Sequence, residues 1–402
     1  MNYRAPWWLP EGNLQTIWAA LCARRYAQTA PVFRRERWTT PDGDFVDVDQ
    51  TNQAPTLPTA CGFLQGMEPP QSLTSCSSLP PEGAASRGSK SANAGLDGTQ
   101  KGCVSQPGGL QGLRPGEAGS VDLAGAGVSP MLSAEQASRP LLVLFHGLEG
   151  SSGSHYAQAF ADVACRRGWV FAVPHFRGCS GELNLAPRAY HSGDFAEVDW
   201  ILRRFAAEHP GPVVAVGVSL GGNALMRWAG ETGHKARQVV AAVASVCAPL
   251  DLAASGRAIG RGFNRQVYTR MFLNSMVPKA LEKLDQHPGL FNRKALLAAR
   301  DLYAFDDIFT GPVHGFKGVD DYWKRASAKP HLGRVAVPAL VLNALNDPFI
   351  PPASLPRQAD VSAQVTLWQP VHGGHVGFPS SSFPAHVRAM PEAVTDFFAA
   401  QL

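Results

Sequence analysis

The sequence predicts a protein of the α/β class, built on a mostly parallel, doubly wound sheet. Two observations lead to this prediction: short apolar runs alternate with amphipathic helical segments in the second half of the chain, and the connections between them are short. With 45% hydrophobic and 17% charged residues, the 402-residue chain can build a substantial core around such a sheet.

Strands are predicted where short runs are mostly apolar, as in strands buried on both faces of a sheet. These runs occupy residues 141–145, 169–173, 212–218, 239–246, 339–343 and 365–368. Helical spacing occurs at residues 155–167, 194–209, 223–230 and 391–402. Earlier in the chain, the turn residues 41–43 separate the strand-like segments 35–39 and 44–48, which is typical of a hairpin.

Two segments interrupt this pattern and divide the chain. Residues 51–138 are rich in Gly, Ser, Pro, Ala and Gln and contain a single aromatic residue, Phe63, so we expect a disordered insertion. Residues from about 248 to 334 are helix-rich and lie between two core strands, where we expect either a helical cap that contacts substrate or helices packed on the core edge. Residues 1–50 then supply an N-terminal segment and the hairpin, and residues 139–402 the core with its cap.

Charge and cysteine content exclude several classes of protein. The net charge of +4 comes without any basic block, so no nucleic-acid partner is expected. Seven cysteines, an odd number without a CxxC pair, indicate neither a disulfide framework nor a zinc site and favour the cytoplasm. The N-terminus lacks the pattern of a signal peptide, and no run of about 18 apolar residues predicts a membrane span. We expect no metal and no organic cofactor; the oligomeric state is not indicated.

The most informative motif is Gly217-Val218-Ser219-Leu220-Gly221. It follows a predicted strand and precedes a predicted helix, and its glycines relieve crowding around a sharp turn. A serine in such a turn is typical of a nucleophile, which also needs a base, a group to orient that base, and donors for an oxyanion. A tight glycine turn without chemistry is the alternative.

The base and the orienting acid are expected later in the chain, each after a strand. His375 is the predicted base because the glycines before it suit a projecting loop, and His372 is the competing histidine. Asp347 is the predicted acid, since it follows the strand 339–343; Asp320 and Asp321 are weaker candidates because no strand precedes them.

Two backbone N–H groups are predicted to form the oxyanion hole: that of Leu220, directly after the nucleophile, and that of Leu148, in the loop after the strand 141–145. Arg177 is expected to contact substrate or to form a structural ion pair. Cys179 has no adjacent base and is not predicted to be a nucleophile.

These motifs resemble those of the YheT-like proteins, the AB hydrolase 4 family. The similarity covers nearly the whole chain outside the insertion and rests on these segments: 7–16 (WWLPEGNLQT), 146–152 (HGLEGSS), 176–181 (FRGCSG), 217–223 (GVSLGGN), 346–349 (NDPF) and 373–378 (GGHVGF). The resemblance implies an α/β-hydrolase fold with Ser219, Asp347 and His375 at the triad positions, and it favours His375 over His372.

The function expected from these features is hydrolysis of carboxylic esters, with short- to medium-chain or lipid-like acyl groups, through an acyl-serine intermediate. The partner is then a small-molecule ester. Acyl transfer from a thioester to an alcohol uses the same intermediate and is the main alternative. A non-catalytic binding protein is a third, which an intact triad disfavours.

Overall fold

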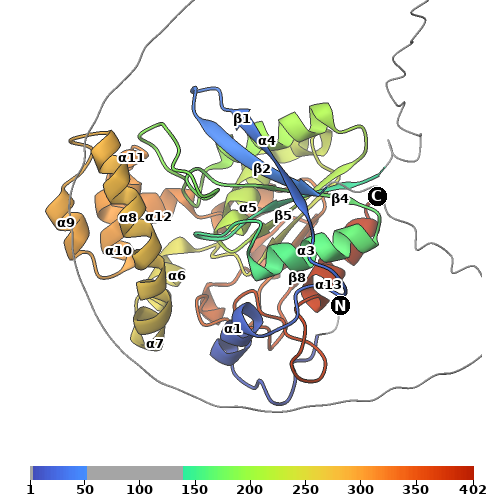
Figure 1. Cartoon of the computed structure of the whole chain (residues 1–402). Helices are drawn as coiled ribbons and strands as arrows, with labels where there is room; N and C mark the ends of the chain where they lie inside the picture. The colour runs from blue at the N-terminus through green and yellow to red at the C-terminus, as the bar shows by residue number, and fades with distance from the viewer. Residues whose placement is uncertain (1–2, 52–138) are drawn as a thin grey trace, which may run out of the picture. The chain divides into compact units, whose positions relative to one another are not determined.

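The computed structural model describes residues 3–51 and 139–402. Within these residues one eight-stranded sheet has the order β1-β2-β4-β3-β5-β6-β7-β8. The strands from β3 to β8 pair in parallel, and the hairpin β1–β2 is added antiparallel at one edge. The strands are β1 (Phe33–Thr39), β2 (Phe45–Thr51), β3 (Leu141–Phe145), β4 (Val170–Pro174), β5 (Val213–Val218), β6 (Ala242–Val246), β7 (Ala339–Leu342) and β8 (Val365–Trp368). The predicted fold class is confirmed (Figure 1).

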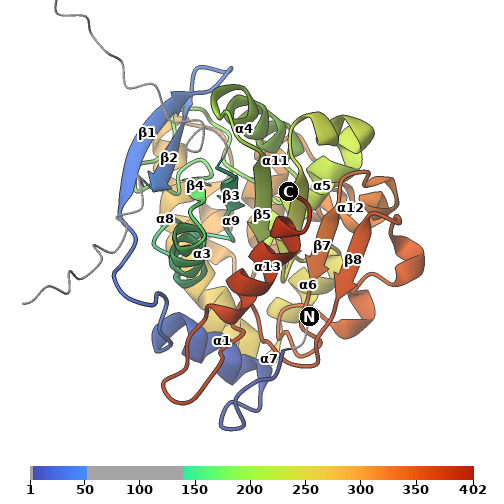
Figure 2. The same cartoon turned by 90° about the vertical axis from the view of Figure 1, so that its right-hand side faces the viewer.

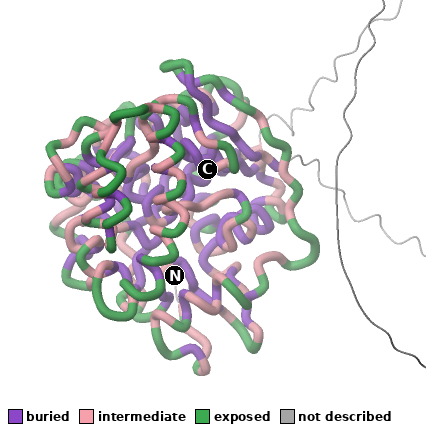
Figure 3. Tube along the Cα trace, turned by 60° about the vertical axis from the view of Figure 1, so that its left-hand side comes forward, coloured by how far each residue is buried: buried purple, intermediate pink, exposed green. Residues whose placement is uncertain are grey.

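Helices cover both faces of the sheet because successive side chains of each strand point to opposite sides. In β3, Leu142 and Leu144 pack in the core on the side of α3 (His155–Arg166) and α13 (Ala389–Ala399). Leu141, Val143 and Phe145 belong to the other core, with α4 (Phe195–Glu208) and α5 (Leu220–Thr232). Figure 2 shows the strands in order between these helices, and Figure 3 shows the buried centre.

The helical region between β6 and β7 joins two neighbouring strands of the sheet. Its helices are α6 (Leu252–Ile259), α7 (Gly262–Asn264), α8 (Arg270–Gln286), α9 (Arg293–Ala298), α10 (Leu302–Phe305), α11 (Gly311–Val313) and α12 (Val319–Ala326). Two π-helical segments, Arg265–Thr269 and Asp306–Thr310, continue α7 into α8 and α10 into α11. None of the described helices is both long and apolar enough to cross a bilayer.

Some element boundaries differ from those predicted. β6 begins at Ala242 instead of 239, because the N–H groups of Val239 and Val240 both donate to the carbonyl of Ala236 in a tight turn. α5 begins at Leu220, directly after the proposed nucleophile, instead of at residue 223.

The N-terminal helix α1 (Gly12–Leu21) was not predicted. Its buried side chains include the polar Gln15 and Thr16, so no apolar periodicity marks the helix in the sequence. At the end of the hairpin, Thr51 is the last residue of β2 and pairs with Phe33. Residues 52–138, where an insertion is predicted, lie outside the described residues, and the predicted domain division stays a prediction.

Candidate active site

Ser219 lies between the end of β5 and the start of α5, with φ 51° and ψ −117°. Few residues other than glycine adopt a positive φ, and such strain is often found at functional sites. The flanking glycines are required by close backbone contacts. A Cβ on Gly217 would lie 2.4 Å from the carbonyl oxygen of Gly221, and a Cβ on Gly221 would lie 2.4 Å from that of Phe145. The predicted sharp turn is therefore present, and it holds the serine at the carboxyl edge of the sheet.

Ser219, His375 and Asp347 form one hydrogen-bonded chain. His375 Nδ1 lies 2.9 Å from Asp347 Oδ2, and His375 Nε2 lies 3.0 Å from Ser219 Oγ. A carboxylate only accepts, so Nδ1 carries the proton and Nε2 accepts from the serine hydroxyl. The other carboxylate oxygen, Oδ1, accepts from the Phe349 N–H at 2.8 Å. The arrangement suits removal of the serine proton by the imidazole.

The alternative candidates lie elsewhere. His372 is exposed, and its Nδ1 is 3.4 Å from Asn346 Nδ2. Asp320 accepts from the Tyr303 hydroxyl, and Asp321 pairs with Arg325 on α12. Among the described residues, none of the three contacts Ser219 or His375 by a hydrogen bond or an ion pair, so the geometry favours Asp347 and His375.

The loop that carries His375 rests on helix α1. The His375 N–H donates to Thr16 Oγ1 at 2.8 Å, and the Gly373 N–H donates to Gln15 Oε1 at 2.7 Å. A Cβ on Gly12 would lie 1.9 Å from the carbonyl oxygen of Asn346, so the helix start and the loop before Asp347 touch backbone to backbone. Sequence reasoning missed these supports, although the Gly-Asn-Leu-Gln-Thr run was part of the family resemblance.

A Thr16→Val substitution should lower kcat about tenfold, because the backbone N–H of His375 loses its acceptor and the imidazole is held less firmly. KM should change little, since Thr16 does not line the cavity beside Ser219. Steady-state kinetics measures this split. Thr16→Ser keeps the hydroxyl and should restore the rate; equal loss in both variants would contradict a role through hydrogen bonding.

The predicted oxyanion loop leaves one amide open. The Gly147 N–H donates to the Tyr156 hydroxyl at 2.8 Å, and the Glu149 N–H donates to the Tyr190 hydroxyl at 3.0 Å. Between them, the Leu148 N–H has no hydrogen bond to any described residue. Leu220, at the first position of α5, likewise lacks an intrahelical acceptor for its N–H. Both predicted donors are thus available to a ligand, and the two tyrosines, which sequence reasoning missed, hold the loop.

Tyr190 also fixes the side chain that follows the open amide. Its hydroxyl donates to Glu149 Oε1 at 2.8 Å, while Lys279 of α8 pairs with Glu149 Oε2 at 2.8 Å. Glu149 itself has a positive φ of 56°. The loop is therefore held in a strained conformation by contacts from two directions, which suits a preorganised oxyanion hole.

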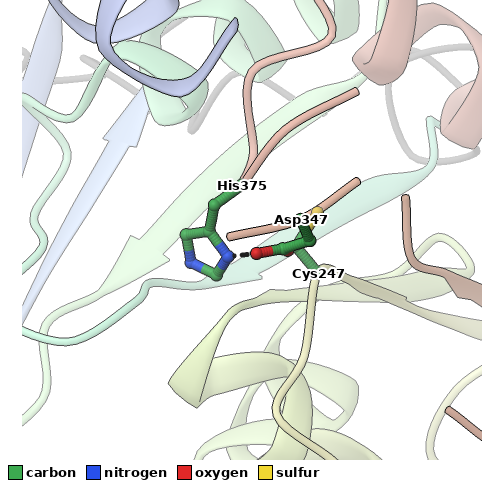
Figure 4. Close-up of side chains that lie close together, drawn as sticks. All are labelled: Cys247, Asp347 and His375. Atoms are coloured by element: carbon green, nitrogen blue, oxygen red, sulfur yellow. Dashed lines mark hydrogen bonds and ion pairs between the residues drawn. The ribbon is translucent and has the colours of Figure 1, made fainter. Parts of the chain in front are cut away.

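Cys247 lies beside the acid and the base (Figure 4), and the ligand atoms of the three side chains lie within 4.8 Å of one another, close enough to share a metal ion. Its thiol accepts from the Val376 N–H at 3.3 Å and donates to the Gly374 carbonyl at 3.6 Å. Burial raises the pKa of Cys247 well above that of a free thiol, which disfavours the thiolate form. The cluster fits a support for the His375 loop.

A cavity of about 1160 Å³, its open mouth included, reaches Ser219, Leu148, Leu220 and His375. Its wall is mostly apolar, and the helical region between β6 and β7 supplies much of it. The apolar side chains from this region include Ile259, Phe272, Met276, Leu302, Phe305 and Phe309. The cavity therefore offers a mostly apolar surface next to the serine.

Arg177 is surrounded by carboxylates, and Cys179 is buried. The buried guanidinium of Arg177 pairs with Glu197 at 2.6 Å, Asp44 at 2.8 Å and Asp42 at 2.9 Å. These contacts support the structural alternative for Arg177. Burial raises the pKa of the Cys179 thiol to about 12, so the nucleophilic thiolate is not available there.

The parallel sheet and the serine turn at the end of β5 are typical of the α/β-hydrolase class, and comparison with known proteins shows the same class. A family model described as alpha/beta hydrolase fold matches residues 140–381, and the chain belongs to this family. Within it, the chain is one of the YheT-like proteins. YheT of Escherichia coli (strain K12), whose name assigns it provisionally to the esterases, is 41% identical over 248 residues, which are 61% of this chain and 72% of YheT.

More distant relatives carry lipase names. Phospholipase ABHD3 of Mus musculus is 28% identical over 274 residues, covering 67% of this chain and 65% of the relative. The monoacylglycerol lipase of Saccharomyces cerevisiae is 27% identical over 259 residues, covering 62% and 57%. The chain is thus similar to enzymes named for ester hydrolysis, although it spans less than two thirds of these two relatives.

Proposed function

We propose that this protein is a serine hydrolase that cleaves carboxylic esters with apolar acyl groups. The observation that carries the proposal is the hydrogen-bonded chain from Asp347 through His375 to Ser219, beside a mostly apolar cavity. The names of YheT and of the two lipase relatives support the same reaction class. Ser219 is the nucleophile, His375 the base, and Asp347 the group that orients the base.

The reaction has two halves. Ser219 Oγ forms a bond to the carbonyl carbon while His375 Nε2 takes the hydroxyl proton, and the N–H groups of Leu148 and Leu220 stabilise the oxyanion. The ester C–O bond then breaks, and the proton passes from His375 to the leaving alkoxide. In the second half, water attacks the acyl-serine, His375 takes a proton from that water, and the proton returns to Ser219 as the carboxylic acid leaves.

The apolar wall supports a substrate with an acyl chain instead of a small polar acid. Burying each additional CH₂ in such a wall contributes about 0.8 kcal/mol, so affinity should rise with chain length until the cavity is full. The odd number of cysteines and the lack of a CxxC pair support a reducing compartment such as the cytoplasm as the site of action.

A panel of p-nitrophenyl esters of graded acyl length tests the proposal. We expect turnover by the wild-type protein, with kcat/KM rising from acetate toward medium chains, and covalent labelling of Ser219 by a fluorophosphonate. If folded protein neither hydrolyses any member of the panel nor is labelled, the proposal is wrong and a binding role is favoured. Product analysis with an acyl thioester and an alcohol separates the alternative: more ester than free acid would identify an acyltransferase.

A further inference from the structure

The helical stretch between Asp251 and Glu282 carries only positive charges. It contains four arginines and one lysine and no acidic residue. The arginines are Arg257, Arg261, Arg265 and Arg270, and all four are exposed. Among the described residues none of these arginines forms an ion pair, whereas Lys279 does, with Glu149. The stretch therefore presents four unpaired cations to solvent.

The same stretch exposes apolar side chains. Phe263, Val267 and Met271 are 53%, 37% and 55% exposed, and they are spaced four residues apart along the continuous helix formed by α7, the π-helical segment and α8. Residues at this spacing lie on one side of a helix. Figure 1 shows α7 leading into α8 at the outer edge of the helical region. We call the exposed surface of this stretch, which carries these three side chains and the four arginines, the basic apolar face; Arg257 belongs to α6, and the other three arginines lie in the continuous helix or directly before it.

Other side chains of this helix belong to the wall of the active-site cavity. Phe272 and Met276 line the cavity, and Tyr268 is buried against Phe349, with ring centroids 4.6 Å apart. Phe349 in turn lies against His375, with ring centroids 4.2 Å apart. The helix thus has some side chains in the cavity wall and others exposed to solvent.

The start of the helix is attached beside the proposed catalytic acid. Asn264 Nδ2 donates to the carbonyl of Pro348, the residue after Asp347, at 2.6 Å. The Tyr268 hydroxyl donates to Asn13 Oδ1 of α1 at 3.1 Å. Anything bound to the basic apolar face is therefore held next to the site.

We infer that the basic apolar face binds the surface of anionic phospholipid bilayers. Exposed arginines in the same stretch as exposed Phe, Val and Met side chains match the requirements of an interfacial helix, whose apolar groups enter the acyl boundary while its cations meet anionic headgroups. Nucleic acid would use the arginines but leave the apolar side chains in water. Delivery of a bilayer-resident ester into the cavity rests on the proposed function; binding to the bilayer does not.

Vesicle flotation of the full-length protein tests this inference. We expect binding to phosphatidylcholine vesicles that contain about one third phosphatidylserine, and much weaker binding to pure phosphatidylcholine. Arg261→Gln/Arg265→Gln should weaken binding about thirtyfold, and raising the salt to about 1 M should have a similar effect. Phe263→Ser/Met271→Ser should weaken binding about tenfold or more.

Matched controls change the same properties elsewhere. Arg34→Gln/Arg203→Gln removes two charges from β1 and α4, and Val32→Ser removes another exposed apolar side chain. Both controls should bind vesicles like the wild type. Equal binding by the face variants and their controls would overturn the inference, as would absence of wild-type binding. Equally strong binding to duplex DNA, lost in the same arginine variant, would overturn the assignment to lipid.

Soluble substrate separates this inference from the proposed function. Turnover of p-nitrophenyl butyrate should be unchanged in the face variants, while turnover of a long-chain ester dispersed in the anionic vesicles should fall with binding. If the wild type binds vesicles but cleaves no ester, the proposed function fails and the membrane surface stands. If the wild type cleaves the soluble ester but binds no vesicle, the membrane surface is wrong and the proposed function stands.

Discussion

Ser219→Ala should reduce kcat/KM for a p-nitrophenyl ester by roughly a millionfold, leaving only the residual rate that an oxyanion hole and binding provide. The loss follows from removing the nucleophile, because no acyl-serine can then form. The free energy of unfolding should change by no more than about 1 kcal/mol, since among the described residues the Ser219 hydroxyl makes one hydrogen bond, to His375. Kinetics and urea unfolding of the purified variant measure the two effects.

A neighbouring serine provides the control for this experiment. Ser245 pairs with Gly217 across β5 and β6, and its buried hydroxyl has no hydrogen-bond partner within the described part of the chain. Ser245→Ala should therefore keep nearly full activity. Comparable activity in Ser219→Ala and the wild type would contradict the proposed mechanism, and loss in both variants would indicate a folding defect.

Asp347→Asn should lower kcat by about ten-thousandfold with little change in KM. The asparagine can donate from its amide nitrogen, which allows the imidazole to take the tautomer with its proton on Nε2, where it cannot accept from Ser219. The substitution also removes the negative charge that stabilises the imidazolium. Steady-state assays with a saturating concentration of the ester measure kcat directly.

The competing acid supplies the comparison. Asp320→Asn alters a carboxylate on α12 that accepts a hydrogen bond from the Tyr303 hydroxyl, so the activity of this variant should stay near that of the wild type. If Asp320→Asn loses most of its activity while Asp347→Asn stays active, the orienting role belongs to Asp320 and the proposed role of Asp347 is wrong.

The sequence alone was sufficient for the sheet and for the serine turn. Strands such as 141–145 are continuous apolar runs, because a strand covered by helices on both faces has no polar side to mark it. The turn at Ser219 is also a local matter: Gly217 and Gly221 are separated by four positions, and their Cβ atoms would collide with nearby backbone. Features that depend on residues close together in the sequence can therefore be predicted from it.

The hydrogen bonds that support the site could not be predicted from the sequence, because they join residues far apart in it. Thr16 and His375 are separated by 359 residues, and Gln15 and Gly373 by 358, so only the folded chain brings helix α1 beneath the histidine loop. Tyr156 and Tyr190 likewise determine which amide of the oxyanion loop stays open, through contacts over 9 and 41 residues. The sequence by itself determined the fold class, since periodicity marks the strands and helices, and it suggested the candidate triad from the glycine turn, the order along the chain and the family resemblance. The tertiary structure decided how the triad is supported and which surface surrounds its cavity, because hydrogen bonds between distant segments exist only once the sheet has set their positions.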